Sequence, residues 1–175
     1  MRGCRPSESV TPQQPVPLLT EYGHLLPLSG SALDLACGAG RNAIFLAQQG
    51  LEVTGIDRSE DVLAEAKEAA EKSGVQVKWV AEDLETAPFP LPPNLYDVIT
   101  CFYYRDPRLY PQIFAALRPG GILVYETYTL DQLRHDFGPR DPDHLLAPGE
   151  LLRVFQRLEL LFYREMALEK AVAGL

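Results

Sequence analysis

The sequence predicts an α/β fold, a doubly wound and mostly parallel sheet with helices on both faces. Short apolar runs alternate along the chain with helical patterns of about ten residues, which is typical of β–α–β units. Glycine, proline or acidic residues separate most of these patterns. The length of 175 residues fits one domain, and 46% hydrophobic with 23% charged residues excludes a disordered chain.

Five apolar runs are expected to form the sheet. Each run is short and ends at a glycine or polar residue, as expected for strands buried on both faces. The predicted strands lie at residues 32–36, 51–56, 75–81, 96–101 and 122–127.

Helices are expected where apolar residues recur at helical spacing. Gly50 is expected to end the helix that follows the first strand. Ser59 is a good N-cap for the next helix, which ends at Gly74 and has acidic residues in its first turn. The predicted helices span residues 18–28, 41–49, 59–74, 108–117 and 149–155.

The remaining segments interrupt the alternation or lie at the ends of the chain. Four prolines between residues 84 and 95 leave no room for a helix, so a loop is expected there. Residues 1–14 are rich in Ser, Pro and Gln and are expected to form a flexible arm before a single domain over 15–175. Two late strands are also expected, one at 158–163 and an incomplete one at 171–175.

Charge and cysteine content exclude several classes of protein. With 16 Lys and Arg against 24 Asp and Glu, the net charge of −8 argues against nucleic acid or an anionic membrane as a partner. The three cysteines are widely spaced without a Cys-x-x-Cys pair, so neither a disulfide framework nor a metal site is expected. Without a long apolar span or an apolar leader, the chain is expected to be cytoplasmic.

The residues that follow each strand are the candidate site, because ligands of doubly wound folds lie beyond the carboxyl ends of the strands. The first such segment reads Leu-Asp-Leu-Ala-Cys-Gly-Ala-Gly-Arg-Asn-Ala from Leu33 to Ala43. Gly38 and Gly40 allow a ligand to approach the backbone at the start of a helix. The spacing Gly-x-Gly-x-x-Ala also fits a dinucleotide fingerprint, so a nicotinamide-binding oxidoreductase is the rival interpretation.

Three acids favour a different ligand. Asp57 follows the second strand and can accept hydrogen bonds from both ribose hydroxyls of an adenosine. Asp83 follows the third strand and can reach an adenine amino group, with Leu84 and Cys101 against the ring faces. Asp34 lies inside the first strand, where a carboxylate is costly without a partner. A positively charged ligand would supply that partner, whereas a pyrophosphate would not.

Together these motifs resemble those of the class I S-adenosylmethionine-dependent methyltransferases. The resemblance runs from about Leu33 through Val124 and includes Leu117-Arg118-Pro119-Gly120-Gly121 before the fifth strand. It implies a Rossmann-like fold with the first strand in the centre, the second and third on one side, and the fourth and fifth on the other. It also implies S-adenosylmethionine as the cofactor, bound by Asp34, Ala36, Cys37, Gly38, Gly40, Arg41, Asp57, Arg58, Asp83, Leu84 and Cys101.

A narrower resemblance rests on two short stretches. Residues 37–42 and 148–153 are similar to small methyltransferases of the tellurite-resistance type, which implies a small acceptor such as a metalloid oxyanion or a thiol. The fourth strand end, at 101–106, lacks the Asn-Pro-Pro-Tyr motif that enzymes methylating exocyclic amino groups of bases have in common. A non-catalytic cofactor-binding module and a methyltransferase of a protein or RNA remain as alternatives.

Few catalytic side chains are expected, because transfer of a methyl group from a sulfonium mainly requires positioning, desolvation and removal of a proton. Candidates lie at the fourth and fifth strand ends and in a later polar segment, with Tyr103, Arg134 and His135 as the main catalytic candidates. The others are Tyr104, Arg105, Glu126 and Tyr128. Arg134 and His135 belong to a long polar segment that is expected to close as a lid over a small acceptor.

This segment spans residues 128–149 and also holds Arg140, a third group that can be cationic in an acidic protein. A closing lid favours a small-molecule substrate over a large polymer. No metal, nucleic acid or membrane partner is expected, and the chain is expected to be a monomer or a homodimer.

Overall fold

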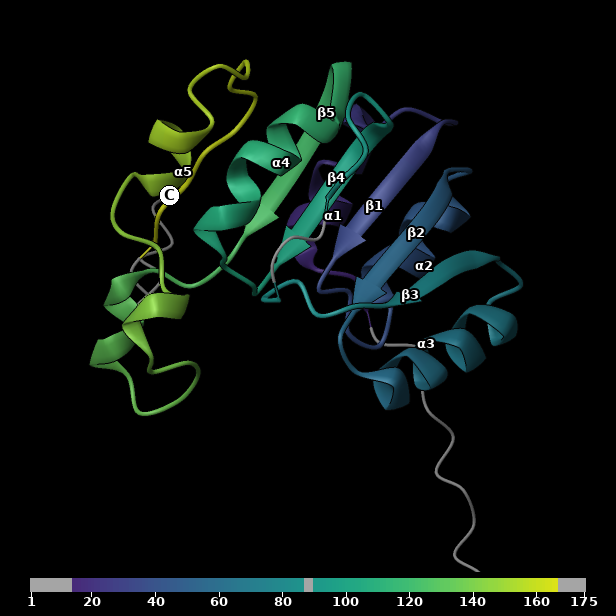
Figure 1. Ribbon diagram of the computed structural model, residues 1–175, viewed down its shortest axis with the longest axis horizontal. Helices are drawn as coiled ribbons and strands as arrows, with labels where there is room; N and C mark the ends of the chain where they lie inside the picture. The colour runs from purple at the N-terminus through teal and green to yellow at the C-terminus, as the bar shows by residue number, and fades with distance from the viewer. Residues whose placement is uncertain (1–13, 87–89, 167–175) are drawn as a thin grey trace, which may run out of the picture.

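A five-stranded parallel sheet in the order β3-β2-β1-β4-β5 forms the centre of the computed structural model, which describes residues 14–86 and 90–166 (Figure 1). The central position of β1, between β2 and β4, confirms the predicted strand order. The strands are β1 (Ser31–Leu35), β2 (Glu52–Asp57), β3 (Val77–Ala81), β4 (Tyr96–Phe102) and β5 (Leu117–Glu126).

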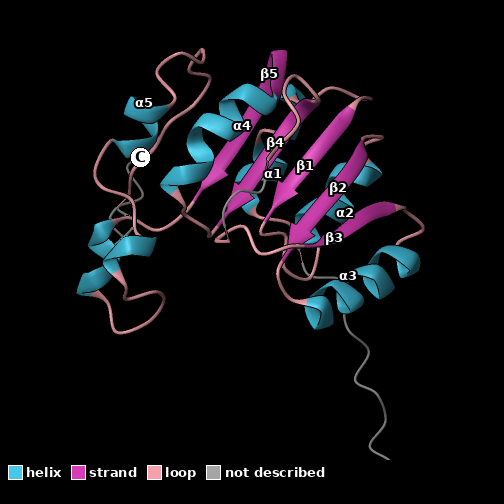
Figure 2. Ribbon diagram, viewed as in Figure 1, coloured by secondary structure: helices cyan, strands magenta, loops and turns pink. Residues whose placement is uncertain are grey.

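Helices lie on both faces of this sheet, as predicted (Figure 2). One hydrophobic core joins the short helix α1 and helix α2 to the sheet, and α3 packs on the same side against β2 and β3. The other core lies between the sheet and α4 and includes a residue next to α5. The helices are α1 (Pro17–Glu21), α2 (Arg41–Gln48), α3 (Glu60–Lys72), α4 (Tyr110–Ala116) and α5 (Glu150–Val154).

Several local predictions are confirmed, with adjusted boundaries. Ser59 caps α3, since its Oγ accepts a hydrogen bond from the amide of Val62 at 3.3 Å. The helix expected over 18–28 is shorter, because α1 ends at Glu21 and the 3-10 turn η1 (Gly23–Leu25) follows it. The other 3-10 turns are η2 (Pro107–Leu109), η3 (Leu130–Arg134) and η4 (Pro142–His144).

The prediction of a strand at 158–163 is wrong. This segment is irregular, and β4 is the only partner that pairs with β5 among the described strands. An apolar run forms a strand only when a neighbour accepts its hydrogen bonds, and here Leu160 and Leu161 stay 61% and 57% exposed. The strand expected at 171–175 and residues 1–13 of the predicted arm lie outside the described residues.

Two kinds of feature are absent from the described residues. No helix in the described ranges is long and apolar enough to cross a membrane. Within the same part of the chain, no group of three His, Cys, Asp or Glu side chains is placed to hold a metal ion.

Candidate functional site

The turn between β1 and α2 has a left-handed backbone at three positions. Ala36, Gly38 and Gly40 have φ values of +52°, +53° and +78°. A Cβ atom on Gly40 would lie 2.5 Å from the Trp79 ring and 2.9 Å from Ala66, so the turn packs directly on β3 and α3. A Cβ atom on Gly38 would meet nothing within 4 Å. One side of the turn is therefore packed against protein and the other is open.

Asp57 fastens this turn to the end of β2. Its Oδ2 accepts a hydrogen bond from the amide of Gly38 at 2.9 Å, and its Oδ1 accepts one from the amide of Ser59 at 3.0 Å. The sequence predicted contact of Asp57 with a ligand but not this structural role. A carboxylate has about four acceptor positions, so two hydrogen bonds leave room for a ligand hydroxyl.

Asp34 lies on the face of β1 that looks toward α2, and it is only 1% exposed. The hydroxyl of Thr100 on β4 donates to Asp34 Oδ1 at 2.7 Å, whereas Oδ2 has no hydrogen-bond partner among the described residues. Burial raises the pKa of Asp34 to about 7, because desolvation outweighs the Thr100 hydrogen bond, the attraction of the Ala43 backbone amide and the positive charge of Arg41. The Ala43 amide does not meet the geometry of a hydrogen bond to Oδ2. A buried polar atom without a partner is rare and requires an explanation.

The predicted adenine contacts lie at the ends of β3 and β4. Leu84 and Cys101 are buried in the same hydrophobic core, and Asp83 is half-buried. Burial raises the pKa of the Cys101 thiol to about 12 and also raises that of Cys37, so both thiols are neutral at physiological pH. Both cysteines can therefore offer apolar contact but not a charge. The predicted contact Arg58 is exposed next to Asp57.

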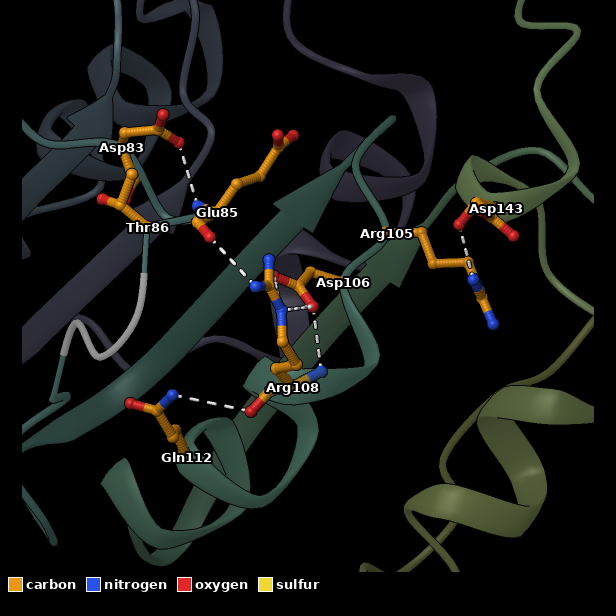
Figure 3. Close-up of polar contacts among 8 residues, drawn as sticks. All are labelled: Asp83, Glu85, Thr86, Arg105, Asp106, Arg108, Gln112 and Asp143. Atoms are coloured by element: carbon orange, nitrogen blue, oxygen red, sulfur yellow. Dashed lines mark hydrogen bonds and ion pairs between the residues drawn. The ribbon is translucent and has the colours of Figure 1, made fainter.

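Arg108 connects the turn after β3 with the loop after β4 (Figure 3). Its Nη2 lies 2.7 Å from Oδ2 of the buried Asp106, and its Nη1 donates to the carbonyl of Glu85 at 2.9 Å. The amide of Glu85 in turn donates to Asp83 Oδ1 at 2.9 Å. Sequence patterns did not indicate this connection, which fixes the turn that carries Asp83.

A second ion pair fastens the segment that was expected to be a lid. Arg105 Nε and Nη2 donate to the two carboxylate oxygens of Glu150 at 2.8 and 3.1 Å, and the Tyr110 hydroxyl donates to Glu150 Oε1 at 2.6 Å. Arg105 also donates to the carbonyl of Asp143 at 2.6 Å (Figure 3). The end of the segment is therefore held against the loop after β4.

Replacement of Glu150 by glutamine is expected to lower the free energy of unfolding by about 2 kcal/mol, since hydrogen bonds to a buried charge are lost. Burial alone would raise the pKa of Glu150, but Arg105 and Tyr110 hold it below its usual range. This stabilisation is therefore present at neutral pH and is lost as the pH falls through the acid range. Urea unfolding at pH 7 measures the effect. An unchanged midpoint would contradict it, and Glu159→Gln, an exposed acid, is the control.

The rest of the predicted lid is partly packed and partly exposed. A parallel bridge joins Thr129 to Leu146, and Gln132 is buried. Arg134 is exposed and lies 3.4 Å from Asp131, while the His135 ring lies tilted against the ring of Phe137. The contacts of Arg134 and His135 thus lie within their own segment, and their action on an acceptor stays a prediction.

Tyr103 borders the glycine turn. The guanidinium carbon of Arg41, the first residue of α2, lies 5.6 Å from the centre of the Tyr103 ring. The Tyr103 hydroxyl donates to Glu126 Oε1 at 3.0 Å. The structure therefore brings one catalytic candidate, Tyr103, next to the turn predicted to hold the cofactor.

Comparison with known proteins decides the family. Residues 32–121, half of the chain, match the family model described as a methyltransferase domain. The chain belongs to this family. The methyltransferase domain holds all the predicted cofactor residues within the matched range.

The methyltransferase domain is also similar to curated proteins named ubiquinone biosynthesis O-methyltransferase. The protein from Pectobacterium carotovorum is 39% identical over 100 residues, which are 54% of this chain and 41% of that protein. The protein from Coxiella burnetii is 33% identical over 138 residues, which are 68% of this chain and 58% of that protein. The chain thus spans about half the length of these relatives.

Solved structures show the same fold. An S-adenosylmethionine-dependent methyltransferase from Mesorhizobium loti has a TM-score of 0.62 and 23% identity, over 79% of this chain and 78% of that one. The PH0226 protein from Pyrococcus horikoshii has a TM-score of 0.54 and 27% identity, over 67% of this chain and 56% of that one.

Fold and family together confirm a class I methyltransferase domain with S-adenosylmethionine as its cofactor. The narrower resemblance to tellurite-resistance-type methyltransferases is not confirmed, because the curated relatives are named O-methyltransferases.

Proposed function

We propose that this domain transfers the methyl group of S-adenosylmethionine to an oxygen atom of a small molecule. The observation that best supports the cofactor site is the buried Oδ2 of Asp34, which has no hydrogen-bond partner among the described residues. An ammonium or sulfonium group would supply the partner that this buried carboxylate oxygen lacks. The bound cofactor supplies a methyl group already activated by its sulfonium, so the chain itself must bind, orient and exclude water.

The strand ends fit the cofactor in other ways. The open side of Gly38 leaves space for a ligand against the backbone, and Asp57 keeps acceptor positions for a ribose. Asp83 with the buried Leu84 and Cys101 suits an adenine ring, whose edge is polar and whose faces are apolar. The remaining proposed contacts are Ala36, Cys37, Gly40, Arg41 and Arg58.

The acceptor is proposed from the relatives. Their name describes methyl transfer to oxygen, which favours a hydroxyl acceptor over the metalloid oxyanion or thiol expected from the narrower resemblance. A small molecule also suits the segment over 128–149, which lies beyond β5 near the carboxyl ends of the strands (Figure 1).

The cofactor assignment predicts a specific loss of affinity. Asp57→Ala is expected to weaken S-adenosylhomocysteine binding by roughly 1.5–3 kcal/mol, the range for hydrogen bonds to a charged group. Isothermal titration calorimetry measures this loss, and a melting curve shows whether the variant stays folded. Asp61→Ala, an exposed acid in the first turn of α3, is the matched control and should bind normally. Equal affinity in the Asp57 variant would remove the ribose assignment, and binding of NAD in place of S-adenosylhomocysteine would favour the oxidoreductase.

A further inference from the structure

A carboxylate and two aromatic rings lie together at the carboxyl ends of β4 and β5. Glu126 is the last residue of β5 and pairs in register with Phe102, the last residue of β4. The rings of Tyr103 and Tyr128 lie 5.6 Å apart between their centres, tilted by 35°. None of these groups is among the cofactor contacts proposed above.

Glu126 holds Tyr103 at two points. The amide of Tyr103 donates to the carbonyl of Glu126 at 2.8 Å, and its hydroxyl donates to Glu126 Oε1 at 3.0 Å. Tyr103 has a φ of +57°, a left-handed conformation that is unfavourable for a residue with a side chain. Such strain persists only where neighbouring contacts enforce it, and it is concentrated at functional sites.

This cluster borders the proposed cofactor site and is open to solvent. Tyr103 is 45% exposed and lies beside Arg41, directly after the glycine turn, while Glu126 and Tyr128 are half-buried. A molecule resting on the two rings would therefore lie next to the turn and within reach of the carboxylate. Aromatic side chains pack favourably against a further planar ring in offset or edge-to-face arrangements.

We propose that Glu126 takes the proton from the hydroxyl group of the acceptor, while Tyr103 and Tyr128 bind a planar ring that carries this hydroxyl. The proposal rests on the proposed function and adds the acceptor class and the base. The acceptor oxygen forms a bond to the methyl carbon as the methyl–sulfur bond breaks, and the electron pair of that bond stays on sulfur. The proton passes to Glu126 and then to water.

Tyr103 cannot replace Glu126 as the base, because its hydroxyl keeps its proton. Burial and the neighbouring Glu126 raise the pKa of Tyr103 to about 12, so its hydroxyl stays protonated and continues to donate to Oε1. Tyr103 therefore orients the carboxylate and leaves Oε2 for the acceptor. A carboxylate within hydrogen-bond reach of the acceptor hydroxyl satisfies the geometric requirement for a general base.

The first test measures acceptor binding without turnover. 7-Hydroxycoumarin, a fluorescent planar phenol, is titrated into the protein saturated with S-adenosylhomocysteine. We expect saturable binding below 1 mM, a loss of at least tenfold for Tyr128→Ala, and near-normal binding for Tyr128→Phe, which keeps the ring. Absence of saturable binding to the wild-type complex, or equal binding by Tyr128→Ala, would overturn the proposed binding of a ring by Tyr103 and Tyr128.

The second test measures transfer to the same probe, whose product is 7-methoxycoumarin. Glu126→Gln is expected to lower kcat at least 100-fold, since general-base catalysis contributes about 10²–10⁴-fold, with probe affinity changed less than threefold. Tyr103→Phe, which keeps the carboxylate, should lose less than tenfold. Formate should restore part of the rate of Glu126→Ala, which a merely structural role of Glu126 would not allow.

The outcomes separate this inference from the function on which it rests. Failure of the wild-type protein to bind S-adenosylhomocysteine contradicts the proposed function itself. If the cofactor product binds, then full activity of Glu126→Gln, or probe binding without transfer by the wild-type protein, overturns the role of Glu126. Loss of activity in Glu126→Ala without formate rescue also contradicts it.

Discussion

Replacement of Gly40 by alanine is expected to lower the free energy of unfolding by roughly 2–5 kcal/mol and to abolish binding of S-adenosylhomocysteine. Two costs combine at this position: a left-handed φ of +78°, and a Cβ atom 2.5 Å from Trp79 and 2.9 Å from Ala66. Ala66 cannot move cheaply because it is fully buried in α3, and the Trp79 ring is confined because it also packs against Gly55 of β2. Relief of the clash must therefore displace the turn itself.

Gly38→Ala provides the matched control two residues earlier. Its φ of +53° carries a similar backbone cost, but its Cβ atom meets no protein atom within 4 Å. We expect a stability loss of only about 1–2 kcal/mol, together with at least tenfold weaker binding, because the methyl group enters the space proposed for the cofactor. Thermal melting and calorimetry on both variants check this. Equal stability losses would show that packing behind Gly40 is not decisive, and normal binding by Gly38→Ala would place the cofactor elsewhere.

The contrast between these glycines shows what sequence patterns can predict. Gly-x-Gly after an apolar run indicates a turn that a ligand approaches, and the strand order follows once the motifs of the class are found. The spacing does not tell which glycine faces a ligand and which faces protein. That difference depends on Trp79 and Ala66, which are distant in sequence and reach Gly40 only through the sheet and α3.

Other parts of the site depend on long-range contacts in the same way. Glu150 looks like an acidic residue in the first turn of a helix, where the helix dipole alone would explain it. Its pairing with Arg105, 45 residues earlier, requires the folded connection between β4 and α5. The failed strand at 158–163 has the opposite cause, because its apolar pattern is real but no described strand lies beside it as a partner.

The contribution of Asp34 to the stability of the protein is expected to fall as the pH rises from about 4 to about 7. The folded state holds the proton of Asp34 up to a pKa of about 7, whereas the unfolded chain releases it near 3.8. In that interval the unfolded state binds fewer protons, so stability falls as the pH rises and levels off above pH 7. The two pKa values of Asp34 differ by about three pH units, which corresponds to a change of about 4 kcal/mol in the free energy of unfolding.

Asp34→Asn isolates this effect, because the amide keeps the Thr100 hydrogen bond and cannot titrate. The free energy of unfolding of the wild-type protein minus that of the variant, from urea titrations between pH 4 and pH 8, should fall by about 4 kcal/mol and then stay constant. A flat difference would contradict the assigned pKa.

The pKa of Asp34 also predicts how the affinity for the cofactor depends on pH. If Oδ2 of Asp34 receives the positive charge of the cofactor, then binding below pH 7 must displace the Asp34 proton. Affinity for S-adenosylhomocysteine should therefore rise up to about tenfold per pH unit from pH 5 to pH 7 in the wild-type protein and change little in Asp34→Asn. Calorimetry in buffers of different ionisation enthalpy counts the released proton directly. Binding of equal strength across this range, without proton release, would show that the unpartnered oxygen does not face the cofactor's charge, and the ammonium would then have to be bound by another acceptor at the end of β1.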